Sequence, residues 1–480
     1  MNHRMVFSTV GKIVWAEGVL LLLPYIVSLI YKEECSSAFL ITILVAVVVG
    51  TLLATLFKKK DDIIYSKEGF MTVSLSWIIL SLIGALPFRL SGEIPHYIDA
   101  IFETVSGFTT TGASILTDIE AMSKSLLFWR SFTHWIGGMG VLVFIMAIIP
   151  NVSKRSIHIM RAEVPGPVKG KLVPKMRDTA KILYTIYIVL TVIEIFLLRI
   201  GGMPWFDSIV HAFGTAGTGG FGIKADSIAS YSPYLQWVIT IFMILFGVNF
   251  NIYFLLLIRR FKAIGKSTEL WVYLGIIATA VLCITVNIYP MYNDLSTTVR
   301  DASFQVASII TTTGYATADF NLWPSFSKAI LFALMLLGAC AGSTGGGFKV
   351  SRVIIIFKKI GSEIKRLLHP RSVKVITFEG KRLEEQAITG TTVYLAVYMV
   401  CFILIFLAVS LDRFDFETNF SAVAACFNNI GPGFGVVGPV GSYADYSVFS
   451  KIVLSVAMLL GRLEIFPLII VAMPATWSKN

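Results

Sequence analysis

The stretch Ser106-Gly-Phe-Thr-Thr-Thr-Gly112-Ala113 follows an apolar run and a short amphipathic stretch, and it precedes another apolar run. The same pattern occurs three more times along the chain. The other copies read Phe213-Gly-Thr-Ala-Gly-Thr-Gly219-Gly, Ile309-Ile-Thr-Thr-Thr-Gly314-Tyr and Cys426-Phe-Asn-Asn-Ile-Gly431-Pro. An internal repeat of this size decides the architecture, because each copy is one structural unit. The predicted unit is helix, short helix, Thr/Gly strand and helix, four times over.

The composition places these units in a membrane. Of the 480 residues, 56% are hydrophobic and 14% are charged, whereas an ordinary soluble domain carries roughly 25% charged residues. A hydrocarbon core of about 30 Å needs roughly 20 apolar residues per helix. Ten such runs are present, at 13–31, 38–57, 70–90, 125–149, 180–202, 235–258, 269–289, 326–357, 387–409 and 447–473. We therefore expect an all-α integral membrane protein with ten transmembrane helices, of which the first two form an extra N-terminal pair outside the repeat.

The charge distribution predicts the orientation. The formal net charge is +11, and a strongly basic protein often binds nucleic acid. Here, however, the basic residues gather in alternate connections, at 58–67, 150–181, 259–266 and 349–382. Cytoplasmic loops carry such an excess, so both termini are expected in the cytoplasm and no nucleic-acid partner is expected. This basic side is predicted to contact anionic membrane lipid or a regulatory subunit.

The Thr/Gly segments suit a dehydrated monovalent cation. The amphipathic stretches at 99–108, 205–214, 300–310 and 417–427 are too short to cross a bilayer, so they are expected to be re-entrant half-helices. Extended backbone at membrane depth lines a watery cavity or is buried in protein. Rings of backbone carbonyls replace the hydration shell of an ion, and the negative C-terminal ends of the half-helices also favour cations. The four repeats are therefore predicted to surround one central pore in pseudo-fourfold symmetry.

Twelve residues form the predicted potassium selectivity filter. They are Thr110, Thr111, Gly112, Gly217, Thr218, Gly219, Thr312, Thr313, Gly314, Asn429, Ile430 and Gly431. A single Thr/Gly pair is more typical of a tight turn or of close helix packing, but four copies in one setting favour the filter. Acids on the outer side are predicted to concentrate cations at the mouth; these are Glu103, Asp207, Asp301 and Glu417.

With Gly342-Ser-Thr-Gly-Gly-Gly-Phe-Lys349 and Gly461-Arg462-Leu-Glu464, the four segments make the sequence resemble the Trk/Ktr/HKT superfamily of potassium transporters over essentially the whole chain. The extra N-terminal pair is similar to the TrkH branch. The resemblance implies potassium as the transported ion, held by filter residues alone, and no organic cofactor. It further implies a homodimer with one pore per protomer, a cytosolic nucleotide-binding subunit of the TrkA kind, and a bacterial plasma (inner) membrane. By this resemblance, Gly112 is expected to matter most for the potassium preference, because sodium-selective plant relatives have Ser there, whereas Gly217 and Gly222 depart from the family pattern.

A glycine-rich break interrupts the apolar run 326–357, at Gly342, Gly345, Gly346 and Gly347. Glycines let an unwound segment flex, so this segment is predicted to be an intramembrane gate; a helix kink with close packing is the alternative. Lys349 either assists the gate or anchors the cytoplasmic end of a helix.

Arg462 is the second gate candidate. It lies near the middle of the last apolar run, where a charge is costly and normally faces a bundle interior or water. We expect it to repel cations below the filter. The alternatives are a structural pair with Glu464, or a side chain that snorkels to the interface.

The predicted domains follow the repeats. They are an N-terminal two-helix unit at 1–62, pore repeat 1 at 63–150, a cytoplasmic basic loop at 151–178, pore repeat 2 at 179–262, pore repeat 3 with the gate loop at 263–360, a cytoplasmic basic segment at 361–386 and pore repeat 4 at 387–480.

Other functions fit less well. A cation-coupled symporter, carrying K+ with H+ or Na+, is the alternative, but four repeats of one orientation disfavour the inverted repeats of such transporters. No nucleophile–base arrangement indicates an enzyme, and Gly217–Gly222 matches a dinucleotide motif without the strand that such a site requires. His134 is expected to pack rather than catalyse. Glu194 is a proton or sodium site, or pairs with Arg199 or with a neighbouring helix.

Overall fold

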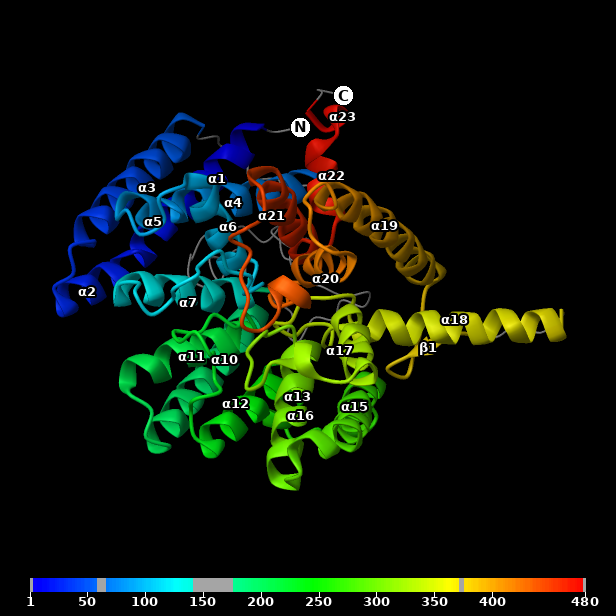
Figure 1. Ribbon diagram of the computed structural model, residues 1–480. Coiled ribbons are helices and arrows are strands. Elements are labelled where there is room, and N and C mark those ends of the chain that lie inside the picture. The colour runs from blue at the N-terminus through cyan, green and yellow to red at the C-terminus, as the bar shows by residue number, and fades with distance from the viewer. Residues whose placement is uncertain (1–2, 58–65, 141–175, 371–374, 478–480) are drawn as a thin grey trace.

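The computed structural model describes residues 3–57, 66–140, 176–370 and 375–477, and the regular secondary structure of this part is helical apart from two short strands. Its N-terminal part contains α1 (His3–Leu20), α2 (Leu22–Tyr31), α3 (Ser36–Leu56), α4 (Ser66–Gly84), α5 (Leu86–Leu90), α6 (Tyr97–Phe108) and α7 (Lys124–Gly138). The next part contains α10 (Met176–Ile200), α11 (Trp205–Gly217), α12 (Pro233–Phe246), α13 (Phe250–Leu257) and α14 (Phe261–Gly265). Figure 1 shows these elements in order of colour, with the two termini close together.

The C-terminal half repeats the same alternation of long and short helices. It begins with α15 (Thr268–Tyr292), α16 (Leu295–Ile310), η1 (Phe320–Leu322), α17 (Ser325–Leu337) and α18 (Val350–Leu368). The strands β1 (Thr377–Phe378) and β2 (Lys381–Arg382) pair antiparallel and form one small hairpin. The chain ends with α19 (Glu385–Val409), α20 (Phe416–Phe427), η2 (Gly435–Val437), α21 (Val448–Arg462), α22 (Phe466–Ala472) and α23 (Pro474–Trp477).

Six stretches of helix among the described residues are long and apolar enough to cross a membrane. They are His3–Tyr31, Ser36–Leu56, Lys67–Leu90, Ala180–Ile200, Thr268–Tyr292 and Glu385–Val409. A seventh is obtained if α12 and α13, which meet at a 90° bend, are counted together. The expected spans 326–357 and 447–473 are interrupted, and 125–149 runs into residues outside the described part. The expected basic loop 151–178 also lies outside it up to residue 175, so the count of ten spans stays a prediction.

The helices that follow the four Thr/Gly segments are all short. The helices α7, α12, α17 and α21 have 15, 14, 13 and 15 residues. At 1.5 Å per residue, each is about 20–22 Å long, which is less than the hydrocarbon core of about 30 Å. A break in the backbone follows three of them directly: the bend after α12, the loop after α17, and the left-handed Glu464 and Ile465 after α21. The glycines after α17 predicted that break, whereas continuous apolar composition concealed the breaks after α12 and α21.

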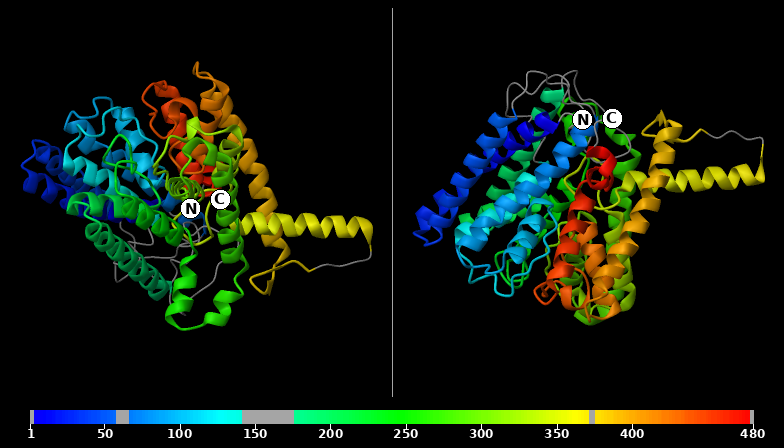
Figure 2. Two further views of the ribbon diagram at one scale, coloured as in Figure 1. Left: turned by 60° about the horizontal axis from the view of Figure 1, so that its bottom comes forward. Right: turned by 90° about the horizontal axis from the view of Figure 1, so that it is seen from above.

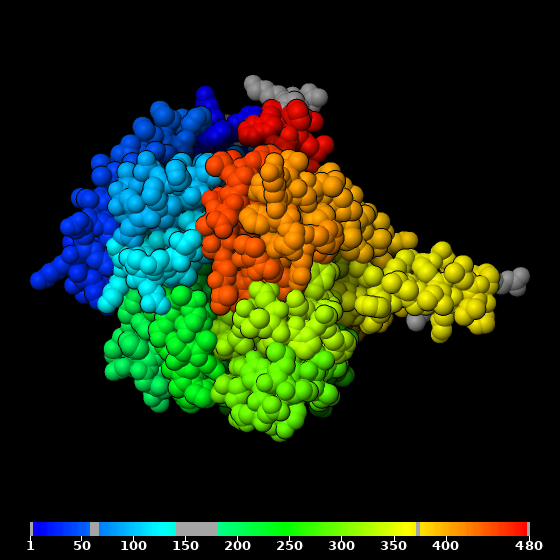
Figure 3. Space-filling model, viewed as in Figure 1, coloured from blue at the N-terminus to red at the C-terminus, as the bar shows by residue number. Residues whose placement is uncertain are grey.

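Each of these short helices packs against the half-helix of the next repeat. Helix α7 packs on α11, α12 on α16, α17 on α20, and α21 on α6. The last contact joins the C-terminal repeat to the first, so the packing closes on itself. In the space-filling view, consecutive parts of the chain surround a common centre in the same order (Figure 3).

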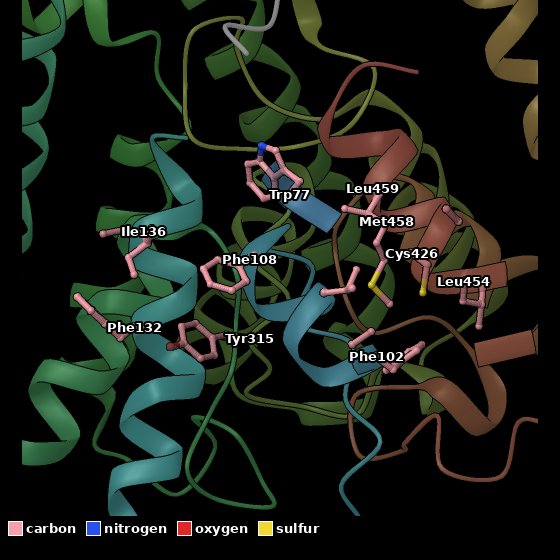
Figure 4. Packing of buried hydrophobic residues seen from close by; sticks show 14 of the residues in the cluster. Trp77, Phe102, Phe108, Phe132, Ile136, Tyr315, Cys426, Leu454, Met458 and Leu459 are labelled. Carbon is pink, nitrogen blue, oxygen red and sulfur yellow. The ribbon is translucent and has the colours of Figure 1, made fainter. Parts of the chain in front are cut away.

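Large apolar side chains fill the space between these helices. Figure 4 shows Phe132 and Ile136 from α7, together with Leu454, Met458 and Leu459 from α21. All five are at most 6% exposed. In a bilayer, close van der Waals packing rather than removal from water holds such side chains together, and this packing fixes the half-helices that the Thr/Gly segments continue.

Helix α18 leaves this body and projects to one side (Figures 1 and 2). Its exposed apolar side chains include Phe357, Ile364 and Leu367, and Lys365 and Arg366 lie in its last turn. The hairpin of β1 and β2 lies beside its first half, where Lys358 Nζ donates a hydrogen bond of 2.8 Å to the Thr377 carbonyl.

Candidate functional site

The half-helices α6, α11, α16 and α20 end in the same way. At each end, one residue that is not glycine adopts the left-handed conformation: Thr110 (φ 55°), Thr218 (φ 53°), Thr312 (φ 59°) and Asn429 (φ 57°). The amide of this residue donates to the carbonyl three residues earlier, at 3.0–3.3 Å. The left-handed conformation costs a residue with a side chain about 1–2 kcal/mol, so the surrounding packing must hold all four turns in place.

The next amide in each segment closes the turn. The four bonds run from Thr111 to Ser106, Gly219 to Gly214, Thr313 to Ser308 and Ile430 to Ala425, each at 2.8 Å. A bond to the carbonyl five residues earlier, together with the bond over three residues, is the Schellman arrangement of a helix C-terminus. The chain therefore leaves all four half-helices along the same path.

One glycine follows each turn, two residues after the left-handed Thr or Asn. These ring glycines are Gly112 (φ 77°), Gly220 (φ 75°), Gly314 (φ 86°) and Gly431 (φ 99°). A Cβ at Gly112 would overlap the carbonyl of Gly219, and one at Gly220 would overlap that of Thr313. A Cβ at Gly314 would likewise overlap the Ile430 carbonyl, and one at Gly431 would lie 2.7 Å from the Thr111 oxygen. Each ring glycine thus faces the carbonyl just before the next ring glycine, and the fourth contact returns to the first segment.

The register of the second segment differs from the one expected from the sequence. The turn geometry makes Gly220, rather than Gly219, the equivalent of Gly112, and it makes Gly219 the equivalent of Thr111. Gly217 is the last residue of α11 and packs so tightly on the His134 carbonyl that no Cβ fits there. Two adjacent glycines follow Thr218, and letter matching cannot decide between them. The other nine predicted filter residues lie in the expected places relative to their ring glycines.

Hydrogen bonds between threonine hydroxyls stabilise the first and third segments. The Thr109 and Thr111 side chains bond each other at 2.8 Å, and those of Thr311 and Thr313 do so at 2.7 Å. The fourth segment uses an amide instead: Asn429 Nδ2 donates to Thr111 Oγ1 at 3.0 Å and to the Met458 carbonyl at 2.9 Å. The fourth Thr/Gly segment is therefore bonded directly to the first.

A buried ion pair joins the first two segments beyond the ring glycines. Glu103 Oε1 lies 2.5 Å from Arg130 Nε, and the two side chains are 0% and 2% exposed. Glu103 also accepts bonds from Ser114 Oγ and from the Ile115 amide, at 2.9 and 3.0 Å. Arg130 donates to the Gly222 carbonyl at 2.9 Å and lies over the Phe221 ring. The expectation that Glu103 attracts cations at an open mouth is therefore wrong, because its charge is buried and neutralised by a residue of α7.

The segment between α17 and α18, residues 338–349, is called the Gly-rich loop below. Gly338, Gly342, Gly347 and Lys349 have positive φ there, so the segment is unwound rather than merely kinked. The Gly346 amide donates to Thr312 Oγ1 at 2.6 Å, which places the loop directly against the third Thr/Gly segment. Lys349 is 2% exposed, and its ammonium group bonds the Gly345 carbonyl. Lys349 therefore bonds the backbone of the Gly-rich loop to which it belongs.

Arg462 also contacts the Gly-rich loop. Its guanidinium donates to the Thr344 carbonyl at 2.9 Å, and to the carbonyls of Gly137 and Gly138 at 2.5 and 2.7 Å. Gly138 ends α7, so the cation lies at a helix C-terminus, where the backbone dipole favours positive charge. Glu464, the partner considered from the sequence, instead forms an ion pair with Arg352 at 2.7 Å. Arg462 thus joins the fourth repeat, the first repeat and the loop.

Two further candidates have structural surroundings. His134 is fully buried; its Nδ1 lies 2.7 Å from the Gly107 carbonyl, and its ring packs on that of Phe221 at a tilt of 33°, in agreement with a packing role. Glu194 is also fully buried on α10, while Arg199 bonds the Met203 carbonyl. The pair of Glu194 with Arg199 is therefore not formed.

Known proteins are similar to this chain over nearly all of its length. A family model for TrkH, described as "Cation transport protein", matches residues 35–479. The Trk system potassium uptake protein TrkH of Salmonella typhimurium is 37% identical over 486 residues, covering 100% of both chains. The Trk system potassium uptake protein TrkG of Escherichia coli is 34% identical, covering 99% of each. The crystal structure of the potassium transporter TrkH from Vibrio parahaemolyticus superimposes with a TM-score of 0.88, at 32% identity, and covers 100% of both chains.

Proposed function

Because the chain belongs to the TrkH family of cation transport proteins, we propose that it carries potassium across a membrane through the ring of its four Thr/Gly segments. The single observation that carries the proposal is the closed sequence of contacts among Gly112, Gly220, Gly314 and Gly431 and the carbonyls before them. Such carbonyls replace the water around a monovalent cation. The chain is a multi-pass membrane transporter and not an enzyme, as its potassium-transporting relatives indicate.

In this proposal, the filter has three residues in each repeat. They are Thr110, Thr111 and Gly112; Thr218, Gly219 and Gly220; Thr312, Thr313 and Gly314; and Asn429, Ile430 and Gly431. Selectivity comes from backbone oxygens, so the different side chains of the four repeats do not matter for it. The negative ends of the half-helices point to the same place, which adds a favourable field for a cation.

The Gly-rich loop and Arg462 form the proposed gate below the filter. This role is supported by the bond from Gly346 to Thr312 and by the bond from Arg462 to the Thr344 carbonyl, which hold the loop against the filter. Arg462 and Lys349 also bring positive charge to the same region, and this charge opposes the passage of a cation. Opening then requires that the loop leave these partners.

The larger organisation belongs to the proposal as well. We assign one N-terminal helix pair, four pore repeats, ten spans and cytoplasmic termini in a bacterial inner membrane. We also assign a homodimer and a cytosolic nucleotide-binding regulatory subunit. Cation-coupled symport with H+ or Na+ is the alternative mode of transport.

The full-length protein, purified and reconstituted in liposomes, tests the proposal. Potassium should inhibit rubidium uptake more strongly than sodium does. Gly112→Ser should weaken that preference, because the added Cβ overlaps the Gly219 carbonyl. Gly222→Ser is the matched control, because a Cβ there has its nearest neighbour at 3.6 Å. An absence of alkali-cation flux with the regulatory subunit present, or equal selectivity of the two variants, would refute the filter. Imposed proton and sodium gradients distinguish symport from passive flow.

A further inference from the structure

The Gly-rich loop is held at its beginning by a carboxylate from a different helix. The Ala341 amide donates a bond of 2.8 Å to Glu269 Oε1. Glu269 lies in the first turn of α15 and is 4% exposed. Two backbone bonds complete the attachment, from Cys340 to the Gly247 carbonyl at 3.1 Å and from Phe250 to the Gly342 carbonyl at 3.0 Å. Glu269 is the side chain that joins the loop to α15.

A second carboxylate holds the helix end that carries Glu269. Glu379 Oε1 accepts the Glu269 amide at 3.0 Å and the Ser267 hydroxyl at 3.3 Å. Acidic groups at a helix N-terminus satisfy its free amides and match the helix dipole. The two glutamates therefore form one chain of contacts. Glu379 holds the start of α15, and Glu269 in that first turn holds the Ala341 amide.

Glu379 comes from the hairpin, residues 376–383, which is too small to be stable alone. Glu379 and Gly380 form its turn with φ of 51° and 72°, and a left-handed glutamate costs about 1–2 kcal/mol. Ile376, Phe378 and Leu383 are buried in the same hydrophobic cluster as Cys340 and Val350, at the two ends of the loop. The hairpin thus depends on the loop region for its packing and presents Glu379 to α15 in a strained turn.

A simple helix cap is the plainer explanation of Glu379. However, Ser267 already serves as the N-cap of α15, where its hydroxyl accepts the Leu270 amide. A cap also does not require that the capped residue use its own side chain to bind a loop 72 residues away in sequence. The geometry points to a longer connection, from the hairpin through α15 to the Gly-rich loop.

We propose that Glu379 and Glu269 are positioning residues that keep the Gly-rich loop closed, and that the hairpin is the element through which the cytoplasmic side releases it. This inference rests on the proposed function, in which the loop is the gate. Displacement of the hairpin removes Glu379 from the start of α15, loosens Glu269 and frees the loop at Ala341. The filter itself is not touched, so ion preference should not change.

Rubidium flux into liposomes that contain the full-length protein tests the inference. We expect Glu379→Ala and Glu269→Ala to raise flux about threefold to tenfold, since each removes a bond to a charged acceptor, with the potassium-to-sodium preference unchanged. Glu269→Gln keeps an acceptor oxygen and should remain near the wild type. The exposed Glu384, which makes no side-chain bond to its own helix end, provides the control Glu384→Ala, expected to have no effect.

The double variant separates a shared path from two local effects. If both glutamates hold one connection, Glu269→Ala with Glu379→Ala should raise flux no further than Glu269→Ala alone. Additive increases would overturn the proposal. Should Glu269→Ala fail to fold, the surface variant Glu379→Ala still decides, because unchanged flux through a well-folded protein overturns the connection.

Arg462→Ala keeps the failure of this inference distinct from that of the gate. If Arg462→Ala raises flux and neither glutamate variant does, the hairpin connection is wrong and the gate stands. If none of the three raises flux, both proposals are refuted.

Discussion

Gly220→Ala is the sharpest test of the ring, because the sequence alone assigns that place to Gly219. Gly220 has φ of 75°, and an alanine in the left-handed region costs about 1–2 kcal/mol. This cost alone reduces an equilibrium population about fivefold to thirtyfold. The added Cβ would also overlap the Thr313 carbonyl, so one of the proposed ion-binding oxygens has to move.

Rubidium uptake and thermal unfolding of the purified protein measure the two effects. We expect Gly220→Ala to lose most of its uptake and its preference for potassium over sodium. Gly222→Ala should stay within about twofold of the wild type, because its Cβ would make only ordinary contacts, the nearest at 3.6 Å.

The same glycine variants made in a His134→Ala protein distinguish the role of Gly220 from that of Gly219. A Cβ at Gly219 would overlap the ring of His134, a side chain, whereas at Gly220 the obstacle is backbone. Gly219→Ala should therefore cause little further loss when His134 is already alanine, while Gly220→Ala should cause its full loss there. The opposite order would refute the register and, with it, the ring of four glycines.

Three other predictions concern the surroundings of the ring. Arg462→Ala removes three bonds to carbonyls of the loop and of α7, and it should raise rubidium flux; equal or lower flux in a folded variant would contradict the gate. Arg130→Gln leaves the buried Glu103 carboxylate without its cation, and thermal unfolding should show a loss of about 3–5 kcal/mol, whereas a loss below about 1 kcal/mol would contradict a structural role of this ion pair. Asp415 caps α20, and hydrogen bonds from the Thr418 side chain and backbone lower the pKa of its carboxyl. The stability that this cap contributes is thus present above the unfolded-state pKa and is lost as pH falls through the folded-state pKa. Asp415→Ala should lower the free energy of unfolding by about 1 kcal/mol at neutral pH. Unfolding experiments on this variant should show no such loss of stability in acid.

The sequence predicted the four segments because composition and order carry that information. Thr110–Gly112, Thr312–Gly314 and Asn429–Gly431 each have one glycine at the decisive place, so matching letters also matches geometry. In Gly217–Gly220 three of four residues are glycine, and the register is set by where α11 ends. Helix ends depend on hydrogen bonds and packing, and these are absent from a string of letters.

The sequence also did not show how deeply a charged side chain is buried or which residue it contacts. Glu103 was predicted to lie at the mouth because several acids occur in the connections that are expected on the outer side of the membrane. Its partner Arg130 follows 27 residues later on another helix, and nothing in its spacing indicates a pair. Glu269 and Ala341 are likewise joined only through the fold. Arg462, by contrast, was recognisable because a charged residue near the middle of an apolar run normally faces a bundle interior or water.

The closed packing of the helices has a consequence for biosynthesis. Half-helix α6 receives its outer neighbour only when α21 is in place, and Asp99 on α6 meets Lys451 on α21 across 352 residues. At about 5–20 residues per second, a ribosome needs roughly 20–70 s to make that length of chain. During this time, α6 and the first Thr/Gly segment lack the packing contact that α21 supplies. A chain that stops before α21 therefore leaves α6 without this neighbour and Asp99 without Lys451.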